Sequence, residues 1–198
     1  MLSTTVPWIA VLILAAASTG LLLSRDWRWD LALLAAQYLG VALLVVQHWP
    51  IGMAAAKLVA GWMATAAIGM TLTSQSQPEV QLEQFWPQGR TFRLFMAGTV
   101  FVVTAAATPR VEGAMAGVEA PIIAGALMLA GMGLLQLGTR SEIPHVIIGL
   151  LTVLAGFEIF YAAVEGSILV AGLLAAVNLG LGLAGAYLLS AATAGETG

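Results

Sequence analysis

Long apolar runs dominate the chain, and short clusters of charged or turn-forming residues separate them. Each run is close to the roughly 20 apolar residues that a helix needs to cross a bilayer. The breaks predict seven membrane-spanning helices, near residues 7–24, 31–48, 51–73, 91–108, 121–138, 144–164 and 167–190. The pattern therefore predicts an all-α, polytopic transmembrane helix bundle that forms one integral membrane domain over residues 1–198.

Prolines mark the expected start of four of these helices. Pro7, Pro50, Pro121 and Pro144 each stand at the beginning of an apolar run, where a missing N–H removes no helical hydrogen bond. The same pattern leaves no proline inside a span, because the helix near 91–108 is expected to end before Pro109. No Lys or Arg precedes the first run, so we expect a retained span and not a signal peptide.

The composition excludes several classes of protein. Of the 198 residues, 60% are hydrophobic and 9% are charged, against about 25% charged in an average soluble domain. Water-soluble enzyme folds are therefore excluded, and a net charge of −3 with seven basic residues leaves no patch for nucleic acid. With no cysteine and two histidines, disulfides and Cys-ligated metals are excluded as well. We expect neither a metal nor a cofactor.

The distribution of arginines favours one orientation. One predicted side holds Arg25, Arg28, Arg90, Arg93 and Arg140, while the other holds Arg110. Because basic residues concentrate on the cytoplasmic side, the N-terminus is predicted outside and the C-terminus inside. The first three and last three spans then run in parallel, which suggests a parallel three-helix repeat whose orientation the fourth span restores.

The longest connection, Ser74–Arg90, would lie on the cytoplasmic side. It carries Glu79, Glu83, Phe85 and Trp86. Two interpretations stay open: a solvated loop with an aromatic anchor at the membrane interface, or a docking loop for a neighbouring subunit.

Lys57 is a candidate functional residue because a charge at membrane depth costs about 2.5 to more than 10 kcal/mol. It lies six residues into the span 51–73, on a stripe of small residues formed by Ala54, Gly61 and Ala64. Such a stripe suits close helix contact, so this face should point into protein. The alternative is a lysine whose ammonium reaches the outer headgroups.

Three further polar residues lie inside the spans. Glu158, fourteen residues after Pro144, is the deepest acid and is either a proton-relay group or a hydrogen-bonded structural carboxyl. Asn178 lies halfway along the last span with small residues on both flanks, which predicts tight packing on both sides and a hydrogen bond across a helix interface. Gln37 is the corresponding mid-span polar residue of the second span, and we expect it too to form a hydrogen bond across a helix interface. Glu158, Lys57, Asn178 and Gln37 are the proton-path candidates.

Other ionisable residues are expected at the membrane surfaces. Asp26 and Asp30 belong to a mixed-charge turn that we expect to be solvated, and Glu165 is expected to be a solvated end charge. His48 and His145 fall on opposite sides of the predicted membrane, so they cannot share a haem or a metal ion.

Residues in both halves of the chain carry a family resemblance. They are Arg28, Leu31 through Gln37, Leu43-Leu44 and Lys57 in the first half, and Arg140, Ile147-Ile148-Gly149 and Ala155-Gly156 in the second. With the length and the seven-span plan, they resemble component E of the hydrogenase 4 type membrane complexes. That family is allied to the small K-type subunit of respiratory complex I and to the C subunit of multi-subunit sodium/proton antiporters.

The resemblance implies a function in ion translocation. Carboxylates in the last two spans of that family are thought to carry protons between neighbouring antiporter-like subunits. In this chain the two positions hold Leu154 and Asn178, and Glu158 follows Leu154 one turn later on the same face. The resemblance thus implies a non-redox subunit of a complex I-like or hydrogenase-like assembly in a prokaryotic cytoplasmic membrane. Its partners in this hetero-oligomeric complex would be larger antiporter-like subunits, which it braces or with which it shares a proton path.

Two other classes stay open. A standalone secondary transporter would hold its substrate between the two three-helix halves, but the unwound mid-membrane segments typical of that class are not indicated. A scaffold subunit that binds pigment or quinone rests on composition alone. An intramembrane protease would need a Ser/His pair or a His-rich metal motif within the spans, so we expect no catalysis by this chain itself.

Overall fold

The structure, a computed structural model, describes residues 2–74, 89–115 and 117–196. Within these residues seven α-helices are found, and all seven are long and apolar enough to cross a membrane. They are α1 (Leu2–Leu23), α2 (Trp27–Val45), α3 (Ile51–Ser74), α4 (Arg90–Ala114), α5 (Ala120–Thr139), α6 (Ile143–Val164) and α7 (Ile168–Glu196). The predicted all-α, polytopic membrane bundle is confirmed. Residues 75–88, which hold the acidic and aromatic side chains of the long connection, lie outside the described residues.

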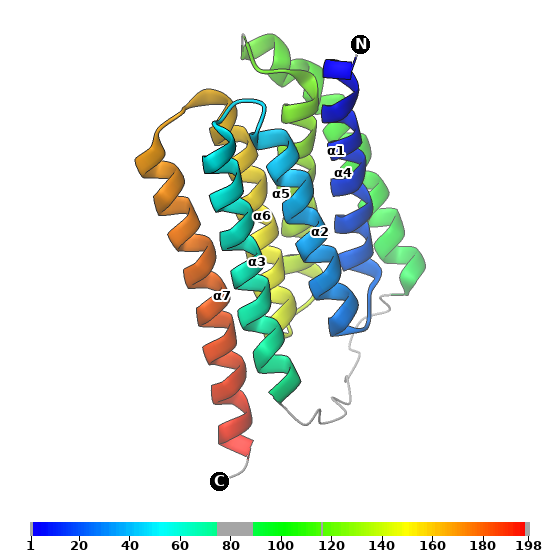
Figure 1. The fold of residues 1–198 in the computed structure, drawn as a ribbon. Coiled ribbons are helices and arrows are strands. Elements are labelled where there is room, and N and C mark those ends of the chain that lie inside the picture. The colour runs from blue at the N-terminus through cyan, green and yellow to red at the C-terminus, as the bar shows by residue number, and fades with distance from the viewer. Residues whose placement is uncertain (1, 75–88, 116, 197–198) are drawn as a thin grey trace.

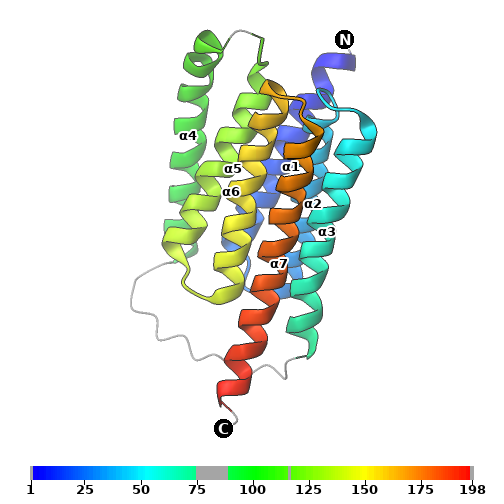
Figure 2. The same ribbon diagram turned by 90° about the vertical axis from the view of Figure 1, so that its left-hand side faces the viewer.

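The helices form two layers of three with one helix outside (Figure 1). In one layer α2 packs between α1 and α3, and in the other α6 packs between α5 and α7. Across the layers α1 contacts α5, α2 contacts α6 and α3 contacts α7. The members of each pair run in the same direction, and α4 packs on α5 and touches α1 (Figure 2). This is the arrangement that a parallel three-helix repeat predicts.

The two termini lie at opposite ends of the bundle (Figure 1). The end at which α1 meets α2 and α5 meets α6 also carries the five arginines predicted to share one side, and we call it the arginine-rich end. The five arginines at this end are Arg25, Arg28, Arg90, Arg93 and Arg140. The assignment of this end to the cytoplasm rests on the positive-inside rule and stays a prediction.

Two prolines lie inside helices, so the prediction that no span contains one was wrong. Helix α4 continues through Pro109 as far as Ala114, and α1 begins before Pro7. Side-chain hydrogen bonds support the α4 backbone on both sides of the proline, because the Thr108 hydroxyl donates to the Thr104 carbonyl at 2.8 Å and Arg110 donates to the Ala106 carbonyl at 3.0 Å. Membrane helices tolerate proline when neighbouring groups compensate in this way.

Small residues let α5 and α6 approach each other closely. A Cβ atom built on Gly156 would lie 2.7 Å from the Ala126 carbonyl oxygen, and one on Gly133 would lie 2.8 Å from the Gly149 carbonyl oxygen. Neither position has room for a side chain, so the two backbones are in direct contact. This contact fixes α6 against the bundle and with it the height of its polar residues.

Helix α7 packs through one flank, not through both as predicted. On the packed flank a Cβ atom on Gly182 would lie 2.7 Å from the Cβ of Ala64, which leaves no room between α7 and α3. The other flank is exposed and consists of Gly172, Ala176, Gly180 and Ala184. The repeat of small residues predicted the periodicity of close packing but not the number of helices available to pack against.

Candidate functional site

Lys57 and Glu158 form a buried ion pair between α3 and α6. Their side chains are 4% and 1% exposed. Lys57 follows the first residue of α3 by six positions and Glu158 precedes the last residue of α6 by six, so each lies about 9 Å from its helix end at 1.5 Å per residue. The ammonium group therefore points into the protein and does not reach the headgroups. Each charge offsets part of the other's cost of burial.

Hydrogen bonds extend this pair to α7 and α2. The Asn178 side-chain Nδ2 donates to Glu158 Oε1 at 2.7 Å, and the Tyr38 hydroxyl donates to Asn178 Oδ1 at 3.0 Å. Asn178 is fully buried and Tyr38 nearly so. We call Tyr38, Lys57, Glu158 and Asn178 the ion-pair cluster. Apart from its ion pair, Lys57 Nζ has no hydrogen-bond partner in the described part of the chain.

The ion-pair cluster lies between the two layers of the bundle. Tyr38 and Lys57 come from α2 and α3 in the first layer, whereas Glu158 and Asn178 come from α6 and α7 in the second. The contacts of α2 with α6 and of α3 with α7 bring the four side chains together. Each layer alone would leave a polar group in an apolar setting, which costs free energy. The cluster therefore ties the two halves of the chain to each other.

Gln37 lies outside the ion-pair cluster although it precedes Tyr38 in the chain. Its Nε2 donates to the Thr152 hydroxyl at 3.2 Å, and Thr152 in turn donates to the carbonyl of Ile148 at 2.8 Å. Gln37 Oε1 is buried and has no hydrogen-bond partner among the residues that the structure describes. The structure thus joins three of the four proton-path candidates in one site and places the fourth in a separate contact between α2 and α6.

Tyr38 is the cluster member that sequence reasoning missed. A tyrosine in an apolar run is usually a core residue, and the partner of the Tyr38 hydroxyl, Asn178, lies on α7, far away in the chain. One feature of the sequence could have indicated a large side chain packed at this position: Gly61, on the stripe of small residues around Lys57. A Cβ atom on Gly61 would lie 2.6 Å from Tyr38 Cε1, so the glycine makes room for the aromatic ring.

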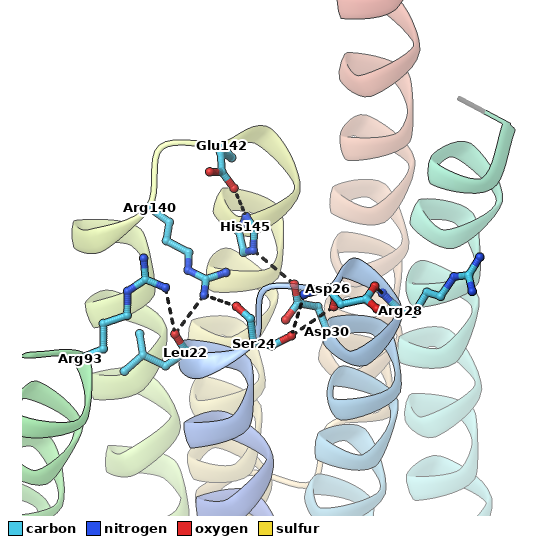
Figure 3. Close-up of polar contacts among 9 residues, drawn as sticks. All are labelled: Leu22, Ser24, Asp26, Arg28, Asp30, Arg93, Arg140, Glu142 and His145. Carbon is cyan, nitrogen blue, oxygen red and sulfur yellow. Dashed lines mark hydrogen bonds and ion pairs between the residues drawn. The ribbon is translucent and has the colours of Figure 1, made fainter. Parts of the chain in front are cut away.

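A second polar cluster lies at the arginine-rich end (Figure 3). Asp30 is buried, which corrects the prediction of a solvated turn: α2 begins at Trp27, with Asp26 as its N-cap, and Asp30 in the first turn faces α6. His145 Nε2 lies 3.2 Å from Asp30 Oδ2, and His145 Nδ1 lies 2.6 Å from Glu142 Oε2. The contact with His145 is the first cause that holds the pKa of the Glu142 carboxyl below its ordinary value of 4.5.

Two arginine side chains cap the C-terminal end of α1 beside this second cluster. Arg140 Nη2 donates to the carbonyls of Leu22 and Ser24 at 3.0 and 2.6 Å, and Arg93 Nη1 donates to the Leu22 carbonyl at 3.4 Å. The last carbonyls of a helix are unpaired and carry partial negative charge, so cations stabilise them. Burial, followed by the charge of Arg93, lowers the pKa of the Arg140 guanidinium.

The remaining ionisable candidates lie apart from both clusters. His48 and Glu165 are exposed at the end opposite the arginine-rich end, and the Glu165 backbone carbonyl accepts a hydrogen bond from Trp49 Nε1 at 3.1 Å. His48 and His145 therefore lie on opposite sides of the bundle. Across the described residues no group of three His, Asp or Glu side chains could hold a metal ion.

Comparison of the chain with family models, with curated proteins and with solved structures finds no significant match. The geometry of the two polar clusters therefore carries the functional argument. The ion-pair cluster can do one kind of chemistry without a cofactor: a carboxylate paired with an ammonium group can bind or release a proton and so change the local charge.

Proposed function

We propose that this chain is a non-redox integral membrane subunit of a complex I-like or hydrogenase-like ion-translocating assembly, and that it shares a proton path with an antiporter-like neighbour. The observation that carries the proposal is the buried Lys57–Glu158 ion pair, held between the two layers of the bundle. The family resemblance read from the sequence supports the same function.

Stability alone is a weak reason for such a pair. Replacement of a buried ion pair by well-packed apolar residues is often neutral or stabilising, and ionisable residues within membrane spans commonly mark ion paths and proton relays. A proton bound by Glu158 would weaken its attraction for Lys57. The ammonium charge would then act on charged residues of an adjacent subunit, which couples the two electrostatically.

Polar contacts at three depths between the two layers of the bundle support a path. From the arginine-rich end inward they are Asp30 with His145, Gln37 with Thr152, and then the ion-pair cluster. Gln37 follows Asp30 by seven residues and Thr152 follows His145 by seven, which is about 10.5 Å and returns to the same helix face. These two contacts are thus stacked along the α2–α6 interface, and the ion-pair cluster, to which α3 and α7 contribute, lies beyond them.

The test is Glu158→Gln in the intact assembly, with proton pumping measured in membrane vesicles. We expect a large loss of pumping with normal assembly, because glutamine keeps the shape and the hydrogen bond to Asn178 but cannot bind a proton. The matched control is Glu165→Gln, a change at the exposed end of the same helix, which should pump at the normal rate. Normal pumping by the Glu158→Gln variant would assign Glu158 a packing role and refute the proposal.

A second candidate function is a standalone secondary transporter. The observation in its favour is that each three-helix half contributes two side chains to the ion-pair cluster, and transporters built from repeats bind their substrates between the repeats. Purification separates the two candidates. Co-purification with large membrane subunits supports the subunit proposal, whereas a stable single chain that transports in liposomes supports the transporter.

A further inference from the structure

We propose that Glu142, His145 and Asp30 form a proton-uptake site at the arginine-rich end of the bundle. The inference rests on the proposed function, because it supplies the point at which protons reach the α2–α6 interface. It assigns a role to Asp30 and His145, which sequence reasoning placed at the membrane surface, and to Glu142, which the sequence analysis did not single out.

The three side chains form a series from solvent into the protein (Figure 3). Glu142 is 39% exposed, His145 is 18% exposed and Asp30 is 4% exposed. Each ring nitrogen of the imidazole faces one carboxylate oxygen, Nδ1 toward Glu142 at 2.6 Å and Nε2 toward Asp30 at 3.2 Å. Both distances are within the reach that proton transfer through histidine needs, although neither nitrogen makes an aligned hydrogen bond with the described residues.

The transfer balances without any other reactant. A proton taken from water by Glu142 passes to Nδ1 of the neutral imidazole, while the proton on Nε2 passes to Asp30 Oδ2. Glu142 is left ionised, Asp30 is left neutral, and the imidazole has exchanged one tautomer for the other. Rotation of the ring, or return of a proton, restores the first tautomer.

The charged groups around His145 leave both carboxylates free for this role. Arg140, from the connection between α5 and α6, donates to backbone carbonyls of α1 and not to Asp30 or Glu142, and Arg93 of α4 donates to the same end of α1. Helix α2 contributes Asp30. Helix α7 holds no Asp, Glu, Lys, Arg or His between residues 168 and 192.

One oxygen of Asp30 takes no part in the contact with His145. Asp30 Oδ1 is buried and has no hydrogen-bond partner in the part of the chain that the structure describes. A buried carboxylate oxygen without a partner is costly and favours a bound proton or a water molecule. Gln37 lies two turns further on the same face of α2, where the next polar contact with α6 is found.

The experiment is chemical rescue of His145→Gly in the assembled protein, with imidazole added on the arginine-rich side. We expect the proton translocation rate to fall at least about tenfold, as for loss of a proton-transfer group, and to rise again with imidazole. A merely structural histidine would not give this recovery. The matched control is His48→Gly, which removes the exposed histidine at the opposite end and should keep the normal rate with or without imidazole.

A normal rate for His145→Gly, or a loss that imidazole does not reverse, would overturn the uptake site. If that variant does not assemble, Asp30→Asn and Glu142→Gln take its place, and normal rates in both would overturn it. The result for Glu158→Gln keeps the two proposals distinct. Inactive Glu158→Gln with normal His145→Gly refutes only the uptake site, whereas normal Glu158→Gln refutes the proposed function and leaves the rescue experiment to decide on the uptake site.

Discussion

The Lys57–Glu158 contact predicts a strongly non-additive double-mutant cycle. Glu158→Gln leaves the Lys57 ammonium buried without the one ion-pair partner that it has among the described residues. Lys57→Met leaves the Glu158 carboxylate with the hydrogen bond from Asn178 at 2.7 Å. Both replacements preserve the approximate shape of the side chain, so charge and hydrogen bonding dominate the change in the free energy of unfolding.

The expected magnitudes follow from the burial of both partners. Removal of one member of a buried ion pair costs about 3–5 kcal/mol, whereas removal of both is close to neutral. Glu158→Gln should be the more harmful single change, because it turns the hydrogen bond from Asn178 into one between neutral groups. Lys57→Met keeps that bond to a charged carboxylate, which is worth about 1.5–3 kcal/mol. The double variant should therefore be more stable than Glu158→Gln alone, with a coupling energy of several kcal/mol.

The assay is unfolding of the purified chain in mixed micelles, monitored by circular dichroism for the wild type, both single variants and the double variant. Glu165→Gln serves as a reference, because an exposed substitution should change the free energy of unfolding by about 0.5 kcal/mol or less. Additive effects of Lys57→Met and Glu158→Gln would refute the reasoning, since two side chains that contact each other cannot behave as independent sites.

Two further predictions concern packing and acid stability. Gly61→Ala should lower the free energy of unfolding by about 1–3 kcal/mol through overpacking against the Tyr38 ring, while Gly52→Ala, where the added Cβ meets open space, should not; equal stability of the two variants in thermal unfolding would contradict this packing. Because contact with His145 holds the pKa of Glu142 below 4.5, Glu142 stabilises the fold above that pH, and this contribution is lost as the pH falls through its folded pKa. Thermal midpoints measured against pH should therefore fall less steeply in acid for Glu142→Gln than for the wild type, and parallel curves would contradict the pairing.

Containment of the ion pair within one chain limits how it can act on a neighbour. With Lys57 and Glu158 4% and 1% exposed, neither can touch a partner subunit directly. A change of one unit charge at the ion pair would still change the energy of a unit charge about 10 Å away by roughly 1.7 kcal/mol, at an effective dielectric constant near 20. That energy suffices to shift a proton equilibrium by more than tenfold, so electrostatic coupling requires no direct contact.

The sequence by itself determined the number of spans, their order and their approximate ends. Hydropathy is a local property, and a run of apolar residues long enough to cross a bilayer has few structures other than a helix. The depth of Lys57 and Glu158 follows from counting residues from the breaks in the pattern. Even the stripe of small residues on the Lys57 face indicated which side of that helix would be buried.

Only the tertiary structure decided which polar groups meet. The contacts of Tyr38 with Asn178, and of Asp30 with His145, join helices far apart in the chain. Each depends on the rotation of a helix about its axis and on its height relative to its neighbours, which backbone contacts such as that at Gly133 fix. A linear pattern of residues contains neither quantity. For that reason the sequence predicted that Asp30 is solvated, whereas the folded bundle buries it beside the His145 imidazole.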